Sequence, residues 1–143
     1  EENACLTGDH IMGWSTTIVA PPDGNMSDYF KSLDKIEARG FDILWPTHGS
    51  PIEGKAFVAE FIQAYRQHRQ DREDGVIAQL KAGQTSIPEM VKIMYVGLEE
   101  RLFPAACLSL LGHMFKLIDE GRVTSSDARP VVQSAFRLTK VDA

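Results

Sequence analysis

Hydrophobic positions in the first half of the chain fall into short runs separated by polar turns. Ala4–Leu6 and Phe41–Trp45 are short apolar runs that predict strands. The β-branched segment Ser15–Ala20 predicts a second strand or an extended segment, ended by a Pro-Pro-Asp-Gly turn. Residues 25–40 carry apolar side chains at helical spacing, which predicts a helix that ends at Gly40. Strands alternating with helices indicate a layered α/β fold.

A second helix is predicted from about Gly54, with an interruption or bend near Gly75. Its apolar side chains lie between Phe57 and Tyr65, and the charged run Arg66–Glu73 is typical of an exposed, salt-bridged helix face. We place a domain boundary after residue 75, giving an α/β unit over 1–75 and a helical unit over 76–143.

The helical unit has the pattern of a winged helix. Ser86 and Glu89 form a capping-box pattern at the start of one helix, and Pro104 opens the next. Residues 122–138 are rich in β-branched residues and predict a small hairpin. Helices followed by a hairpin in about sixty residues are the plan of a winged-helix domain.

Composition excludes several classes of protein. The chain has 143 residues, of which 43% are hydrophobic and 24% charged, so it can bury a core and is not a disordered segment. The longest uncharged stretch, Leu102–Phe115, is too short to span a bilayer. Cys5 and Cys107 have no C-x-x-C partner and are read as reduced thiols of a cytoplasmic protein, although a disulfide between them stays open.

Charge argues against a dedicated nucleic-acid binder. The net charge is -5, and residues 1–54 hold 3 basic and 9 acidic side chains. Residues 85–143 hold seven of each sign, so the winged-helix-like segment would neutralise few phosphates. We therefore expect this segment to cover a cleft or to form a homodimer rather than to bind DNA, and we expect no membrane association.

Asp9 and His48 are the leading candidates for chemistry. Each lies just after a predicted strand in a glycine-containing loop, where layered α/β folds collect ligands and catalytic groups. A carboxylate and an imidazole suit a transition-metal site. Two ligands do not complete a zinc site, which needs three or four.

These two loops together resemble a known family. T-G-D-H-I-M-G-W-S-T-T-I-V-A-P-P-D-G, an amphipathic helix and then W-P-T-H-G-S-P-I are similar to the C-terminal half of metallo-β-lactamase-fold hydrolases. The likeness is to the branch with a winged-helix-like C-terminal domain, which includes the β-lactamase-like protein 2 group and glyoxalase II-like relatives. The run His68-Arg69-x-x-Arg72-Glu73 and the Glu-Gly-Arg-Val segment ending at Val123 fit that branch.

The resemblance implies the C-terminal half of an αββα sandwich with a two-metal site, usually zinc, with iron and manganese as alternatives. Asp9 matches the aspartate that bridges both metals, and His48 matches the last histidine ligand. Thr47 departs from the glycine that many relatives have at this point. The remaining ligands belong to an upstream H-x-H-x-D-H motif and to another upstream histidine, and these 143 residues lack them. We therefore expect a piece of a longer protein that is inactive and retains no metal by itself.

Three other residues have two readings each. His10 and Trp14 are candidate substrate-binding residues, with a structural hydrogen bond and core packing as the respective alternatives. His113 lies among Leu110, Leu111 and Met114, which predicts a core histidine. No catalytic base is assigned.

Three function classes follow. The first is a metal-dependent hydrolase that attacks a small ester or thioester, or an RNA phosphodiester in an endoribonuclease-type reaction. The second is a non-catalytic helical interaction module. The third, a DNA-binding winged helix, is opposed by the charge balance. We favour the first.

Overall fold

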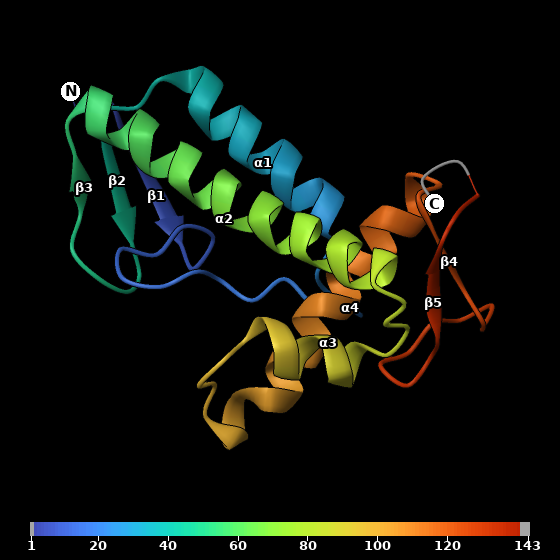
Figure 1. Cartoon of the computed structure of the whole chain (residues 1–143). Coiled ribbons are helices and arrows are strands. Elements are labelled where there is room, and N and C mark those ends of the chain that lie inside the picture. The colour runs from blue at the N-terminus through green and yellow to red at the C-terminus, as the bar shows by residue number, and fades with distance from the viewer. Residues whose placement is uncertain (1, 141–143) are drawn as a thin grey trace. The chain divides into compact units, whose positions relative to one another are not determined.

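The computed structural model describes residues 2–140, which form two compact units (Figure 1). The first comprises Glu1–Thr17 and Asp28–Gln70, and the second comprises Ile18–Ser27 and Asp71–Ala143. Helix α2 (Lys55–Lys81) contributes residues to both units, and the domain boundary predicted after residue 75 stays a prediction.

The first unit is built on a three-stranded sheet in the order β1-β2-β3. Its strands are β1 (Ala4–Gly8), β2 (Ile43–Pro46) and β3 (Ile52–Glu53). β1 and β2 are parallel, and β3 is antiparallel to β2. The connection from β1 to β2 contains helix α1 (Met26–Arg39), as parallel strands require a crossover. The strands predicted at Ala4–Leu6 and Phe41–Trp45 and the two predicted helices are confirmed.

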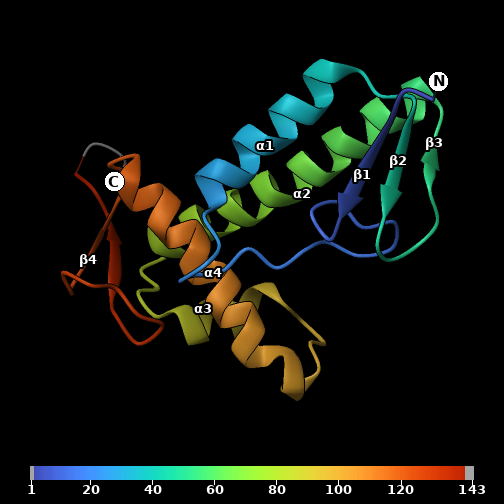
Figure 2. The same cartoon turned by 180° about the vertical axis from the view of Figure 1, so that it is seen from behind.

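Helices α1 and α2 lie side by side on one face of this sheet (Figures 1 and 2). Leu33, Leu44 and Ile62 are almost completely buried in this layer. The other face exposes Leu6 and Trp45, which are register partners on β1 and β2 with 86% and 41% of their surface accessible. Large exposed apolar side chains on an open sheet face are typical of a surface that packs against another layer of structure.

The segment Ser15–Ala20 forms no strand, so the first of its two predicted forms is wrong. Its backbone is satisfied by side chains instead. The hydroxyl of Tyr65 donates to the carbonyl of Ser15, and the guanidinium of Arg69 donates to the carbonyl of Thr17. Because these carbonyls bond to α2, they are not available to a strand ladder.

The second unit is helical with a terminal hairpin. Its elements are α3 (Ile87–Met94), the 3-10 helix η1 (Glu100–Leu102), α4 (Phe103–Asp119), β4 (Val123–Ser125) and β5 (Phe136–Leu138). β4 and β5 pair antiparallel, as predicted. Ser86 is the N-cap of α3, but its side chain makes no capping hydrogen bond, so the capping box is not formed. The backbone of Ser86 forms a bridge with Ala135 instead.

Helix α4 is the central element of the second unit. Residues Glu100–Asp119 are long and apolar enough to cross a membrane by length and composition alone. Leu110, Met114 and Leu117 are nevertheless completely buried in the core of this unit. The apolar character of α4 is therefore accounted for by packing within this fold.

The charged face predicted for α2 is wrong at two positions. Arg69 is 3% exposed and Glu73 is 1% exposed, although the sequence pattern places both on a solvated face. Arg69 lies over the ring of Tyr29, with 5.0 Å from its guanidinium carbon to the ring centre. Glu73 pairs with Lys116 of α4. The helix also continues through Gly75 without interruption.

Candidate metal site and the adjoining pocket

The loops after β1 and β2 bring Asp9 and His48 together. The two strands are parallel neighbours, so their carboxyl ends meet at one edge of the sheet. The amide of Thr47 donates to the carbonyl of Gly8 over 3.0 Å, which extends the pairing to the start of both loops. Asp9 Oδ1 and His48 Nε2 lie 3.5 Å apart, and both side chains are more than half exposed. The two residues singled out from the sequence are therefore adjacent.

The spacing of these two atoms suits a shared metal ion. Zinc binds imidazole nitrogen and carboxylate oxygen at about 2.0–2.2 Å, so two ligands of one tetrahedral ion lie roughly 3.4 Å apart. The observed 3.5 Å fits that separation and is longer than an ordinary hydrogen bond. Among residues 2–140, however, no group of three or more His, Cys, Asp or Glu side chains could hold a metal ion. The described residues thus provide a partial donor set.

A close backbone contact fixes the His48 loop against the loop that follows Asp9. The amide of Gly13 donates to the carbonyl of His48 over 2.8 Å. A Cβ on Gly13 would lie 2.6 Å from the carbonyl oxygen of Ser50, and a Cβ on Gly49 would lie 2.7 Å from the Cα of Gly13. Side chains at either position would push the loops apart, so glycine is needed at both. Gly49 also has a φ of +93°.

Tyr65 of α2 anchors the Met12–Ser15 segment from the other side. Its hydroxyl accepts the amide proton of Met12 over 2.8 Å and is placed to donate to the carbonyls of Met12, at 2.9 Å, and Ser15. Burial raises the pKa of Tyr65, the hydrogen bond with Met12 partly offsets that increase, and the phenol stays protonated at neutral pH. The segment is therefore held by α2 on one side and by the His48 loop on the other.

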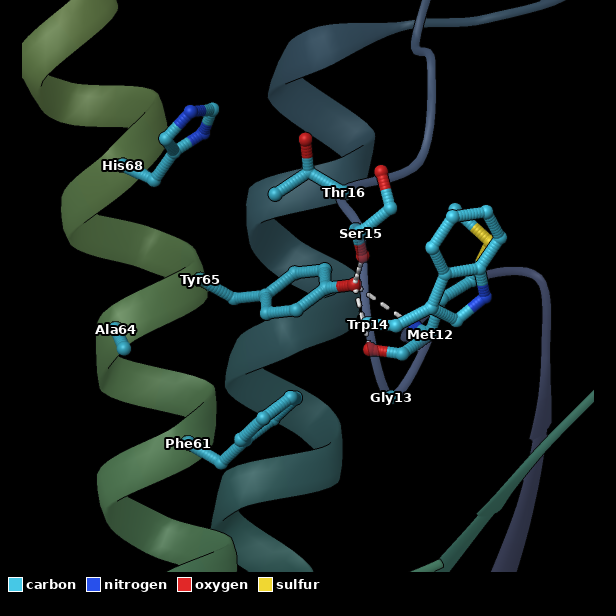
Figure 3. Close-up of a pocket in the computed structure, with 9 residues that line it drawn as sticks. All are labelled: Met12, Gly13, Trp14, Ser15, Thr16, Phe61, Ala64, Tyr65 and His68. Carbon is cyan, nitrogen blue, oxygen red and sulfur yellow. Dashed lines mark hydrogen bonds between the residues drawn. The ribbon is translucent and has the colours of Figure 1, made fainter. Parts of the chain in front are cut away.

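A pocket of about 330 Å³ opens between this loop and α2 (Figure 3). Its walls are residues 12–16 on one side and Phe61, Ala64, Tyr65 and His68 on the other. Trp14 lines the pocket and is 74% exposed, so it is not a core residue. The core-packing alternative for Trp14 is thus excluded, and its role in substrate binding stays a prediction.

His10 faces the helical layer instead. Its ring packs on Tyr29 of α1 with 4.6 Å between ring centres, and the Tyr29 hydroxyl donates to the His10 carbonyl over 2.7 Å. Burial lowers the pKa of His10, and the charge of Arg69 lowers it further. The imidazole is thus neutral at pH 7. Its proposed contact with substrate stays a prediction.

The supporting residues Tyr65 and Arg69 are not found by sequence reasoning. The pattern assigns Tyr65 only to the apolar face of α2, because a buried hydroxyl cannot be told from a buried ring in a periodic pattern. It assigns Arg69 to the solvent because charged runs are mostly exposed. For the close contact of Gly13 with Gly49, the signal in the sequence is the glycine itself, which begins the G-W-S motif and is the middle residue of the H-G-S motif.

Comparison with known proteins places this geometry in a wider context. Residues 86–129 match the model of the beta-lactamase associated winged helix domain. A β-lactamase domain protein from Burkholderia ambifaria superposes with a TM-score of 0.78 at 22% identity, covering 95% of this chain and 42% of that one. A metallo-β-lactamase family protein from Thermus thermophilus gives a TM-score of 0.72 at 20% identity, covering 96% and 42%.

The chain has the C-terminal part of a metallo-β-lactamase fold, followed by a β-lactamase-associated winged helix. Both predictions, of the fold class and of the resemblance, are confirmed. In sequence, the chain is 30% identical over 128 residues to the beta-lactamase-like protein 2 homolog of Drosophila melanogaster, covering 87% of this chain. It is 26% identical over 137 residues to the lactamase-like protein adaB of Aspergillus niger, covering 86%.

The chain spans only 41% of the length of each of these two relatives. In the metallo-β-lactamase fold described here, the Asp9 and His48 loops occupy the carboxyl ends of β1 and β2. Both relatives carry names that describe them as lactamase-like proteins.

Proposed function

We propose that this chain is the C-terminal part of a metal-dependent hydrolase in which Asp9 and His48 bind the metal. The 3.5 Å between Asp9 Oδ1 and His48 Nε2 at the carboxyl ends of two parallel strands carries the proposal. Zinc is the expected ion, since carboxylate and imidazole are among its usual ligands, and iron and manganese accept the same donors.

The proposal includes further ligands from outside these 143 residues. A catalytic zinc needs three protein ligands besides water, and the described residues supply two at this site. Leu6 and Trp45 are exposed on the open face of the sheet, and their exposure supports a further layer of structure that packs on this face. The partial coverage of the relatives points in the same direction.

Bound metal would supply a hydroxide near neutral pH by lowering the pKa of a coordinated water. The residues of this chain position the two ligands. The Gly13 amide fixes the carbonyl of His48, and the Gly13–Gly49 contact sets the position of its loop. The β1 terminus at Gly8 sets the position of Asp9. The Met12–Thr16 loop then lies beside the reaction site and can contact the substrate.

We infer a small ester or thioester as the substrate in preference to an RNA phosphodiester. None of the described side chains that line the neighbouring pocket is Lys or Arg, which phosphate recognition would need. The winged-helix segment has no basic excess either.

The test compares the 143-residue chain with the longest reading frame that contains it. Elemental mass spectrometry should find about two metal ions per longer chain, in line with the two-metal site that the resemblance implies, and less than one in the 143-residue chain. Asp9→Ala and His48→Ala should each reduce the metal content and abolish thioester hydrolysis. Unchanged metal content in both variants would refute the assignment.

A non-catalytic helical module is the second candidate, favoured by the incomplete donor set among residues 2–140. It predicts that the native reading frame begins near Glu1 and that the protein binds no metal. A longer frame containing an H-x-H-x-D-H motif would exclude it.

A further inference from the structure

The pocket between the Met12–Thr16 loop and α2 has no assigned role (Figure 3). Its volume of about 330 Å³ lies at the lower end of the range for small-molecule sites. Its lining is mainly carbon, from Met12, Trp14, Phe61 and Ala64. A site of this size and chemistry favours a compact apolar group over a charged one.

The polar groups of the pocket are few and partly used. The Tyr65 hydroxyl is engaged by the backbone of Met12 and Ser15, so the ring presents mainly its apolar surface. Thr16 and His68 lie at one end of the pocket and Phe61 at the other (Figure 3). The arrangement therefore has a polar end and an apolar end.

The loop that forms one wall of the pocket contacts the loop that carries His48. The Gly13 amide, in the pocket wall, donates to the carbonyl of His48, and a Cβ built on Gly49 would lie 2.9 Å from the Trp14 ring. A substrate whose reacting carbonyl lies at Asp9 and His48 would have part of its structure within reach of Trp14. Because the two loops are in contact, part of the same substrate is the best candidate for the group that occupies the pocket.

We propose that the pocket binds the apolar acyl group of the ester or thioester substrate, with Trp14 and Phe61 as specificity-determining residues. This inference rests on the proposed hydrolase function, since it names the substrate class of the same site. It extends that function by selecting acyl chains of several carbons over acetyl groups, because each buried methylene adds a favourable transfer free energy.

The experiment measures binding without turnover. The intact chain is titrated with 1-butanol, 1-hexanol and 1-octanol, which carry no hydrolysable bond, and chemical shifts of the Gly13 amide and the Trp14 indole are followed by NMR. Affinity should rise roughly threefold to fourfold for each methylene until the pocket is full. Equal affinities across the series, or shifts that spare Gly13 and Trp14, would overturn the proposal.

Two matched variants locate the binding. Ala64→Phe fills the pocket from an exposed position on α2 and should weaken 1-hexanol binding about tenfold or more. Ala59→Phe adds the same ring at another exposed position of the same helix and should leave binding unchanged. Equal effects of the two variants would refute the site.

The metal hypothesis is tested separately. Asp9→Ala should bind 1-hexanol as the unmodified chain does, because Asp9 does not line the pocket. In the longest reading frame without substitutions, absence of metal binding and of hydrolysis together with intact alkanol binding would contradict the proposed function alone. Intact metal binding with no alkanol binding would contradict only the acyl pocket.

Discussion

Glu73 of α2 and Lys116 of α4 form a buried ion pair, with 2.7 Å between Oε1 and Nζ. The Glu73 side chain is 1% exposed and that of Lys116 13%. The second carboxylate oxygen faces His113 Nδ1 at 3.8 Å, and Arg122 lies 3.7 Å from the first. The carboxylate of Glu73 thus links α2 to α4 inside the second unit, in addition to the apolar core that the two helices share.

Removing this carboxylate should destabilise the chain strongly. Glu73→Ala removes the buried carboxylate that faces Lys116 and the fully buried His113. Breaking a buried pair costs about 3–5 kcal/mol where the remaining charge is uncompensated, and because Lys116 keeps its ion pair with Glu120 the loss should lie toward or below the lower end of that range. Urea unfolding of purified chain measures the loss. Glu60→Ala, at an exposed position of the same helix, is the matched control and should change the free energy of unfolding by less than about 0.5 kcal/mol. A loss below about 1 kcal/mol for Glu73→Ala would contradict the assigned role.

The same pair predicts acid sensitivity. Burial raises the pKa of Glu73, but the interaction with His113 and the hydrogen bond and charge of Lys116 outweigh burial, so its pKa lies below the ordinary value of 4.5. Because the folded pKa is depressed, the stabilisation is complete above about pH 4.5 and is lost as the pH falls through the folded value. Thermal unfolding between about pH 3 and 7 should therefore show a steeper decline below about pH 4.5 for the unmodified chain than for Glu73→Gln. If the unfolding temperatures of the unmodified chain and of Glu73→Gln decline in parallel, Glu73 is not the cause of the acid sensitivity.

The sequence predicted the helices, the main strands and the hairpin because their signals are local. Apolar spacing, Gly40 at the end of α1 and the β-branched hairpin each act within a few residues. The proximity of Asp9 and His48 could also be predicted, since both residues follow strands that run parallel. Parallel pairing carries both loops to one edge of the sheet.

The sequence could not predict contacts between side chains on distant elements. Glu73 and Arg69 lie in a charged run whose average behaviour is exposure, and only the positions of Lys116 and Tyr29 explain their burial. The failed strand at 15–20 has the same origin. Its β propensity is overridden because Tyr65 and Arg69, some fifty residues away, take its carbonyls.

The candidate metal ligands should be dispensable for folding. Asp9 and His48 are more than half exposed, so Asp9→Ala and His48→Ala should each change the free energy of unfolding by less than about 0.5 kcal/mol in metal-free buffer. Added zinc should raise the unfolding temperature of the longest reading frame and not that of either variant. Asp23→Ala, at an exposed turn, serves as the control and should keep the full response. A zinc response retained by both variants would contradict their role as ligands.

Tyr65→Phe should loosen the pocket wall without disturbing the sheet. The substitution keeps the ring but removes the hydroxyl that bonds the Met12 amide and the carbonyls of Met12 and Ser15, at a cost of about 1–2 kcal/mol. Hydrogen exchange of the Met12 amide should accelerate by about tenfold. The Thr47 amide, bonded to Gly8 at the edge of the sheet, provides an internal control and should accelerate less, since its partner is unaffected. If the two amides accelerate equally, the hydroxyl stabilises the whole unit rather than the loop. If neither changes, Tyr65 does not anchor the pocket.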